Sequence, residues 1–297
     1  METLDRYRGC LLGLACGDAV GTSVEFSARG TFAPVTDMAG GGPFGLVAGE
    51  WTDDTSMALC LATSLVHRRG TDLDDQISRY VNWWQWGYLS STGNCIDIGM
   101  TVRAALNRYL TTKDPVAGST DPRSAGNGSL MRLAPVAMWF APDIEAVRRH
   151  ARLSSLTTHG APEAVDCCEV YAELLAHALA GAPRDALLRA SASADASARV
   201  REIAEGGYLG KTVDQVLGSG YCVDSLEAAL WCFAETDSFE SAVLAAANLG
   251  DDADTTAAIV GQLAGAHYGV AGIPAHWLEK LAMRDDIDRL AQALFAR

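Results

Sequence analysis

Apolar residues recur three and four residues apart along most of this 297-residue chain, which is the spacing of one helix face. Alanine is abundant in the second half, which favours close packing between helices. No convincing run alternates apolar with polar residues, and no segment repeats at a fixed period. We therefore expect an all-α protein in which residues 1–297 form a single domain, with helices over Leu4–Val20, Met57–His67, Leu73–Trp86, Ile98–Leu110, Ile144–Leu156, Ala164–Leu179, Leu226–Phe233, Ala242–Leu249, Thr255–Tyr268 and Trp277–Phe295.

Three polar, glycine-bearing loops interrupt this helical pattern. They cover residues 22–50, 87–97 and 121–132, and the first contains the run Gly40-Gly41-Gly42-Pro43, which is too rich in glycine for a helix. Loops on a helical scaffold are the usual place for ligand contacts. We expect these three segments to carry part of a binding site.

Two short acidic clusters precede apolar helical patterns at distant places in the chain. One is Thr52-Asp53-Asp54-Thr55 and the other runs from Asp251 to Thr255. Carboxylates and hydroxyls are the ligands that a hard divalent cation requires, and two such turns can hold two cations. The alternative is that these residues are helix N-caps, since Asp and Thr are favoured there. A cap needs one acceptor, however, and Asp252 and Asp254 together exceed that need.

Two known loop motifs do not fit this sequence. An EF-hand starting at Asp252 would place its glycine at Ala257 and its bidentate glutamate at Leu263. Residues 205–212 end like a phosphate-binding P-loop, but Glu205 stands where that motif needs its first glycine, and the preceding segment favours a helix. Both motifs are excluded on these grounds.

The turn Gly126-Asn127-Gly128-Ser129 comes directly before Leu130-Met131-Arg132-Leu133, where we expect a helix to start. Glycine lets the backbone approach an anion closely, and free N–H groups at a helix start can hold a phosphate. A plain turn capped by Ser or Asn fits the same residues. Neither alternative is excluded by the sequence.

Three further polar residues stand out beside these segments. Glu25 lies in a flexible stretch from which its carboxylate can reach a metal or a sugar. Asp97 lies between apolar neighbours, a setting that raises a carboxyl pKa or demands a partner. His159 could contact a ligand. A cap or a solvated loop residue is the commoner fate of such residues, and that alternative stays open.

Composition narrows the classes of function. The formal net charge is −14, from 23 basic and 37 acidic residues, so binding to nucleic acid through phosphate neutralisation is not expected. The start of the chain has no basic leader pattern, and no apolar run is long enough to span a membrane. Eight scattered cysteines form no CxxC pair, which is typical of reduced thiols in a cytoplasmic protein and not of a zinc site. From the residues alone, the chain is a candidate metal-assisted hydrolase for a phosphate-bearing, hydroxyl-rich substrate.

The same motifs resemble those of a known family, the ADP-ribosylglycohydrolases, and most closely the dinitrogenase reductase-activating glycohydrolases. The similarity runs nearly from end to end, and the paired TDDT and DxDT motifs in this order are highly specific. The segments that carry it are RGCLLGLACGDAVGTSVEF, GEWTDDTSMAL, GYLSSTGNCIDIG, GNGSLMRLAPVA, THGAPEAVDCCEVYA and LGDDADTTAAIVGQLAGAHYG.

The resemblance implies an orthogonal all-α fold with a binuclear Mn²⁺ or Mg²⁺ centre in a cleft. The metal ligands that it implies are Thr52, Asp53, Asp54, Asp252, Asp254 and Thr255, with Asp254 as the bridge. Glu25 corresponds to the family's mobile acid and Asp97 to an acid near the substrate ribose. The residues that it places around the diphosphate are Gly126, Asn127, Gly128, Ser129 and Met131, and it places His159 near the distal ribose or adenine.

The activity implied by this resemblance is removal of ADP-ribose from a modified arginine on a target protein, with dinitrogenase reductase as the expected target. The subfamily also implies control by a PII-type signalling protein that recruits the enzyme from the cytoplasm to the membrane. Three alternatives stay open at this stage. They are hydrolysis of a serine or O-acetyl ADP-ribose linkage, cleavage of the diphosphate itself, and a module that binds ADP-ribose without turnover.

Overall fold

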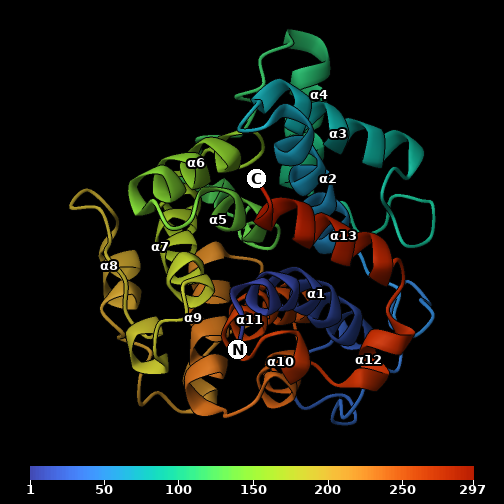
Figure 1. Cartoon of the computed structure of the whole chain (residues 1–297), viewed down its shortest axis with the longest axis vertical. Coiled ribbons are helices and arrows are strands. Elements are labelled where there is room, and N and C mark those ends of the chain that lie inside the picture. Colours follow the sequence, from blue (N-terminus) through green and yellow to red (C-terminus); the bar gives the residue numbers. More distant parts are fainter.

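The computed structural model describes all residues, 1–297, and they form thirteen α-helices with short 3₁₀ turns and no sheet (Figure 1). The expected all-α fold is confirmed. The helices are α1 Thr3–Gly21, α2 Asp53–Arg68, α3 Leu73–Trp86, α4 Met100–Thr112, α5 Ala134–Phe140, α6 Ile144–Leu156, α7 Pro162–Leu179, α8 Ala198–Ala204, α9 Cys222–Glu235, α10 Phe239–Ala247, α11 Ala253–Tyr268, α12 Ala275–Lys280 and α13 Arg284–Phe295.

Two helix boundaries differ from those expected. The segment Trp277–Phe295 is not one helix, because α12 ends at Lys280 and α13 begins at Arg284. Between them Met283 adopts a left-handed backbone with φ 52°, which an α-helix cannot contain. The helix expected directly after the glycine turn starts later, since residues 128–132 form turns and α5 begins at Ala134.

Helices α1 and α11 lie side by side at the centre of the fold (Figure 1). A stripe of glycines lets their backbones touch. A Cβ atom at Gly17 would lie 2.1 Å from the carbonyl oxygen of Ala257, and one at Gly21 would lie 2.4 Å from that of Ala253. Only glycine fits at such distances, so the end of α1 is held directly against the start of α11. This contact brings the two ends that carry acidic residues together.

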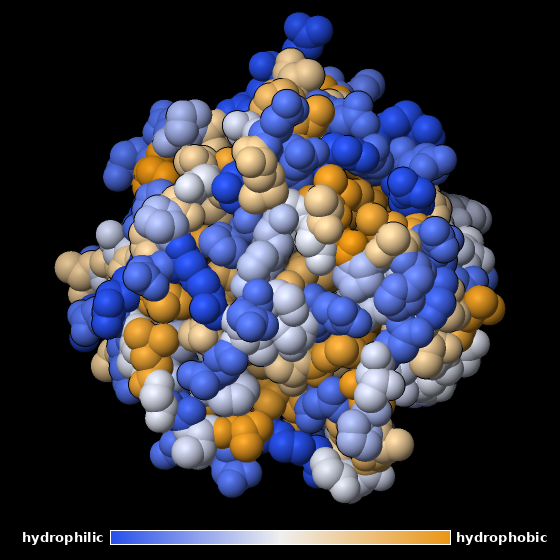
Figure 2. Space-filling view, turned by 60° about the horizontal axis from the view of Figure 1, so that its bottom comes forward, coloured by the Kyte–Doolittle hydropathy of each residue, from blue (hydrophilic) through white to orange (hydrophobic).

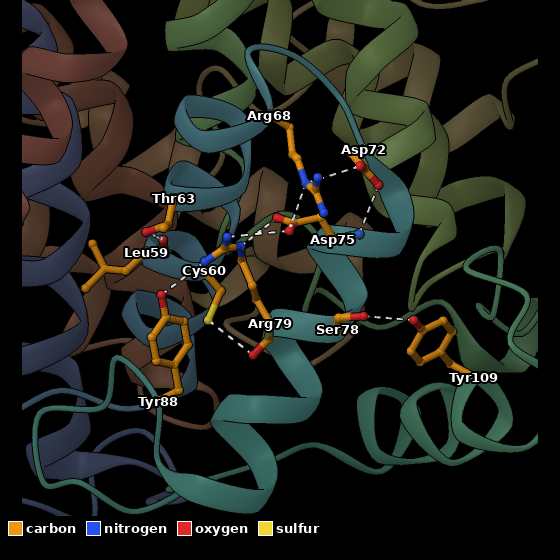
Figure 3. A network of polar contacts seen from close by, with 10 residues as sticks. All are labelled: Leu59, Cys60, Thr63, Arg68, Asp72, Asp75, Ser78, Arg79, Tyr88 and Tyr109. Carbon is orange, nitrogen blue, oxygen red and sulfur yellow. Dashed lines mark hydrogen bonds and ion pairs between the residues drawn. The ribbon is translucent and has the colours of Figure 1, made fainter.

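A smaller apolar core lies among α2, α3 and α4, apart from the large one around α1 and α11. Polar contacts hold α2 and α3 together at its edge, where Asp75 lies between Arg68 and Arg79 (Figure 3). Arg79 also donates a hydrogen bond of 3.0 Å to the hydroxyl of Tyr88. Tyr88 belongs to the loop between α3 and α4 that carries Asp97, so this network fixes the start of that loop.

The surface shown in Figure 2 is largely hydrophilic, with apolar residues in separate patches. None of the helices has the length and apolar character needed to cross a membrane. All eight cysteines are free thiols, and all except Cys95 are buried, as expected from their positions in apolar helical segments.

Candidate functional site

A cleft of about 390 Å³ opens where the starts of α2 and α11 meet the loop before α4 and the glycine turn. The predicted site residues that line it are Glu25, Asp53, Asp97, Gly126, Asn127, Gly128, Met131, His159, Asp252 and Thr255. A second cavity of about 520 Å³ adjoins the cleft and shares Thr101, Gly126 and Gly220 with it. The fold therefore gathers most of the predicted residues in one place.

The two acidic clusters meet beneath this cleft. Asp53 and Asp54 are the first residues of α2, while Asp254 lies in the first turn of α11, and all three are buried. The hydroxyl oxygen of Thr52 lies 3.1 Å from a carboxylate oxygen of Asp54 and 3.2 Å from one of Asp254. Residues about 200 positions apart in the sequence thus share one buried polar centre.

Asp18 is a central member of this cluster that sequence reasoning did not identify. Its fully buried carboxylate accepts the backbone N–H groups of Thr52 and Thr55 at 2.9 and 3.0 Å, and their hydroxyls at 2.8 and 2.7 Å. Carboxylate oxygens of Asp18, Asp54 and Asp254 all lie within 4.8 Å of one another. A charged residue inside the apolar segment of α1 was the signal that could have revealed it.

Glu25 binds the start of α11 from outside that helix. One of its carboxylate oxygens accepts the backbone N–H groups of Ala253 and Asp254, at 2.8 and 3.2 Å. Burial, and then the charges of Asp254 and Asp252, raise the pKa of Glu25 well above its ordinary value. The acid expected to be mobile is thus buried, and one of its oxygens caps α11.

Asp97 faces the same centre from the loop between α3 and α4. Oxygens of Asp97, Glu25 and Asp254 lie within 4.8 Å of one another. Burial, followed by the charges of Asp252 and Asp18, raises the pKa of Asp97 to about 7. Its left-handed backbone, with φ 58°, is a conformation that aspartate tolerates better than most residues. Asp97 is therefore an acid that can hold or release a proton near neutral pH.

The chemistry of this centre suits divalent cations. Seven carboxylates gather here, and none of them forms an ion pair with Lys, Arg or His. One oxygen of Asp54 is buried without any hydrogen-bond partner. Burying so many uncompensated acids is very costly unless protons or cations neutralise them. The residues present therefore fit a metal site with ligands that are all oxygen atoms.

The glycine turn supplies donors on the other side of the cleft. The backbone N–H groups of Gly128 and Ser129 have no acceptor inside the chain. The side chain of Asn127 donates 2.8 Å hydrogen bonds to Asp252 and to Ser225, so it joins this turn to the acidic centre. Free backbone N–H groups in a turn beside a polar cleft are a suitable place for phosphate oxygens.

Two predicted ligand residues differ from the rest in how they meet the cleft. The hydroxyl of Ser129 lies 2.9 Å from the hydroxyl of Ser155 and 3.3 Å from the sulfur of Cys168, and the residue does not line the cavity. Its backbone N–H, and not its hydroxyl, is free. His159 lines the cavity but is only 2% exposed, so it is a buried part of the wall.

A helical fold with a buried acidic centre beside a glycine turn suits a hydrolase, and comparison with known proteins identifies the family. The family model described as ADP-ribosylglycohydrolase matches residues 1–297. The chain therefore belongs to the ADP-ribosylglycohydrolase family. A solved structure described as an ADP-ribosylglycohydrolase-related protein complex is 45% identical, has a TM-score of 0.86, and covers 99% of this chain and 98% of that one.

Curated relatives match over almost the whole chain. A Pseudomonas putida protein named ADP-ribosylarginine hydrolase Tri1 is 48% identical over 100% of this chain and 79% of its own length. The protein of that name from Serratia proteamaculans is 43% identical over 99% of this chain and 80% of its own. A Rhodospirillum rubrum ADP-ribosyl-[dinitrogen reductase] glycohydrolase is 34% identical over 98% and 96%. The expected family is confirmed, but the Tri1 proteins match at higher identity than the nitrogenase-related enzyme.

Proposed function

We propose that this protein hydrolyses the N-glycosidic bond between ADP-ribose and an arginine side chain of a target protein, within one domain that spans residues 1–297. The observation that carries the proposal is the buried acidic centre beside a turn with free N–H groups. The names of the two relatives at 48% and 43% identity support an arginine linkage. The net charge of −14 is also compatible with an arginine-bearing substrate.

The acidic centre would hold two divalent cations, Mn²⁺ or Mg²⁺. The residues that would hold them are Thr52, Asp53, Asp54, Asp252, Asp254 and Thr255. Asp254 belongs to both groups of closely spaced carboxylates, one with Asp18 and Asp54 and the other with Glu25 and Asp97. Bound there, the cations would supply Lewis-acid contacts to ribose hydroxyls and lower the pKa of a water molecule.

The rest of the cleft matches the other parts of ADP-ribose. The free N–H groups of Gly128 and Ser129 would bind the diphosphate, and Met131 and His159 form part of the adjacent wall. The adjoining cavity has room for the remainder of the nucleotide. Holding both ends of the substrate would keep the anomeric carbon fixed above the acidic centre.

Asp97 and Glu25 are the residues available for proton transfer. As the bond between the anomeric carbon and the guanidine nitrogen breaks, the nitrogen needs a proton and the attacking water must lose one. Burial is the first cause of the raised pKa of Asp97, and it favours proton exchange by this carboxyl. Glu25 has one oxygen that is not used in capping α11 and can share this role.

The natural target is a separate part of the proposal. The relative at 34% identity makes ADP-ribosylated dinitrogenase reductase one protein substrate to test. The net charge of −14 is compatible with docking to a cationic surface, either of that target or of a PII-type signalling protein.

The test is hydrolysis of ADP-ribosylarginine by metal-stripped protein, with Mn²⁺ or Mg²⁺ added back and the products identified. Metal-dependent release of intact ADP-ribose is the expected result. Release of AMP would instead indicate cleavage of the diphosphate. Cleavage only of serine-linked or O-acetyl ADP-ribose would overturn the arginine linkage, and no cleavage of any of these would leave a binding role.

A further inference from the structure

Arg132 is a cation buried without an acid. It is fully inaccessible to solvent and forms no ion pair with any carboxylate. Its guanidinium donates to the backbone oxygen of Gly128 at 3.1 Å and to the hydroxyl oxygen of Thr158 at 2.7 Å, and it lies 4.6 Å from the centre of the Tyr80 ring. Only neutral acceptors and one aromatic face therefore surround the positive charge of Arg132. Burying such a charge is costly, so packing alone does not explain this residue.

The contact with Thr158 determines where the proton of that hydroxyl points. An arginine only donates, so the oxygen of Thr158 is the acceptor in its hydrogen bond with Arg132. The hydroxyl of Thr158 is fully buried, and its one remaining neighbour is Nδ1 of His159 at 2.9 Å. The hydroxyl proton has no acceptor other than this nitrogen. Because a buried hydroxyl is normally satisfied, Thr158 donates to Nδ1.

An imidazole that accepts at Nδ1 carries its proton on Nε2 when it is neutral. Nε2 of His159 has no partner inside the chain, and the residue lines the cleft. The ring lies against the glycine turn, since a Cβ at Gly128 would be 2.7 Å from its Cε1 and one at Gly126 would be 3.3 Å from Nε2. The free N–H of His159 thus lies beside the free backbone donors of the turn.

The surroundings also keep the ring neutral. Burial, and then the charge of Arg132, lower the pKa of His159 to about 3. The ring therefore provides one N–H donor across the range in which an ordinary histidine titrates.

We propose that Arg132 and Thr158 are positioning residues that fix His159 as the Nε2–H tautomer, so that it donates a hydrogen bond to a phosphate oxygen of ADP-ribose. This inference rests on the proposed function for the identity of the ligand only. The tautomer itself is a property of the free protein.

The first measurement is of the tautomer in the free wild-type protein labelled with ¹⁵N-histidine, through long-range ¹H–¹⁵N correlation spectra between about pH 5.5 and pH 8. The signals of His159 are identified by their absence in His159→Gln. We expect a protonated Nε2, an unprotonated Nδ1, and no titration over this range. A proton on Nδ1, or titration in the range, would overturn the proposal whatever the activity of the protein.

The second measurement compares Thr158→Val with wild type. Valine keeps the branched shape and removes the hydroxyl, so His159 should populate both tautomers, and calorimetry should show roughly tenfold weaker binding of ADP-ribose. Thr158→Ser should restore both properties, which a loss of packing alone would not explain. The matched control is Thr63→Val, which removes a hydroxyl that only donates to the Leu59 carbonyl within α2.

The outcomes separate this inference from the proposed function. An unchanged tautomer and unchanged affinity in Thr158→Val would refute the positioning role. If the wild type binds no ADP-ribose yet shows the fixed tautomer, the proposed ligand is wrong and the arrangement of Arg132, Thr158 and His159 stands. If Thr158→Val does not fold, the wild-type tautomer still decides the question.

Discussion

The substitution Asp97→Asn separates the charge of this residue from its shape. Asn has nearly the same volume and tolerates the left-handed backbone seen here, φ 58°, as well as Asp does. The carboxylate of Asp97 accepts no hydrogen bond from another residue of the chain, so the amide loses none. Any effect on stability therefore comes from the buried charge.

The size of that effect follows from the pKa. The pKa of Asp97 is about 7 in the folded protein, from an ordinary value of 3.8, because of burial and then the charges of Asp252 and Asp18. Each unit of difference corresponds to about 1.4 kcal/mol, which sets an upper value of roughly 4 kcal/mol. Part of the side chain meets water in the cleft, which reduces the expected effect to roughly 1–4 kcal/mol.

The sign depends on pH. Below about pH 4 the carboxyl is protonated in both states, and the charge contributes nothing. Between about pH 4 and pH 7 the unfolded chain ionises while the folded protein keeps the proton, so the free energy of unfolding of wild type falls as the pH rises. Asn has no such cost. The metal-free variant should therefore match wild type at about pH 4 and exceed it at about pH 8.

The assay is urea unfolding with EDTA present, followed by tryptophan fluorescence at about pH 4.5, 6 and 8. Asp195→Asn is the matched control, because Asp195 is exposed in the segment before α8. In parallel, turnover of ADP-ribosylarginine should fall about 10²- to 10⁴-fold, while ADP-ribose still binds. A stability difference that does not change with pH, or one that favours wild type at about pH 8, would refute the buried charge. Full turnover would remove Asp97 from proton transfer.

Three other predictions follow from the site and its scaffold. Asp54→Ala should lower the measured metal stoichiometry and abolish turnover together, and unchanged stoichiometry in atomic absorption would exclude Asp54 as a ligand. Gly17→Ala should destabilise the protein in urea by about 1–3 kcal/mol or more, since its Cβ would lie 2.1 Å from the oxygen of Ala257. Gly99→Ala has nothing within 4 Å of the new Cβ and should cost clearly less, since only the N-cap preference for glycine is lost. Phe26 is 66% exposed and lines the cleft. Phe26→Ala should therefore raise the KM for a modified protein several-fold and change the KM for free ADP-ribosylarginine by less than about twofold. Equal effects on both substrates would show that Phe26 contacts ADP-ribose instead.

The helical fold could be predicted because apolar spacing is a strong signal in long helices. The break between α12 and α13 could not, because it falls at Leu281, which is extended, and at Met283, which is left-handed, and both residue types are ordinarily good helix formers. A helix was expected to start within Leu130-Met131-Arg132-Leu133, but α5 starts only at Ala134. Pro135 in its first turn is the local signal for that start.

The candidate site was predictable where its residues form short motifs, and not where contacts between distant helices create it. Asp53 and Asp254 stand in recognisable acidic clusters. Asp18 stands alone among small and apolar residues, and its meaning depends on the glycine contact that holds α1 against α11. Arg132 likewise follows the glycine turn in sequence, but its partner Thr158 lies in the segment between α6 and α7. No local pattern contains either pairing.

The sequence left helix capping and metal binding as alternatives for the acidic clusters, and in the structure residues outside the clusters make most of the capping contacts. Thr52 and Asp252, the residues before α2 and α11, make no capping hydrogen bond with their side chains. Asp18 accepts the backbone N–H of Thr55 in α2, and Glu25 accepts two N–H groups of α11. Within the clusters, Asp254 accepts the N–H group of Thr255 at 2.7 Å, so helix capping uses only one of their carboxylate oxygens. Their concentration in one buried place fits the proposed cation site better than a role in helix stability alone.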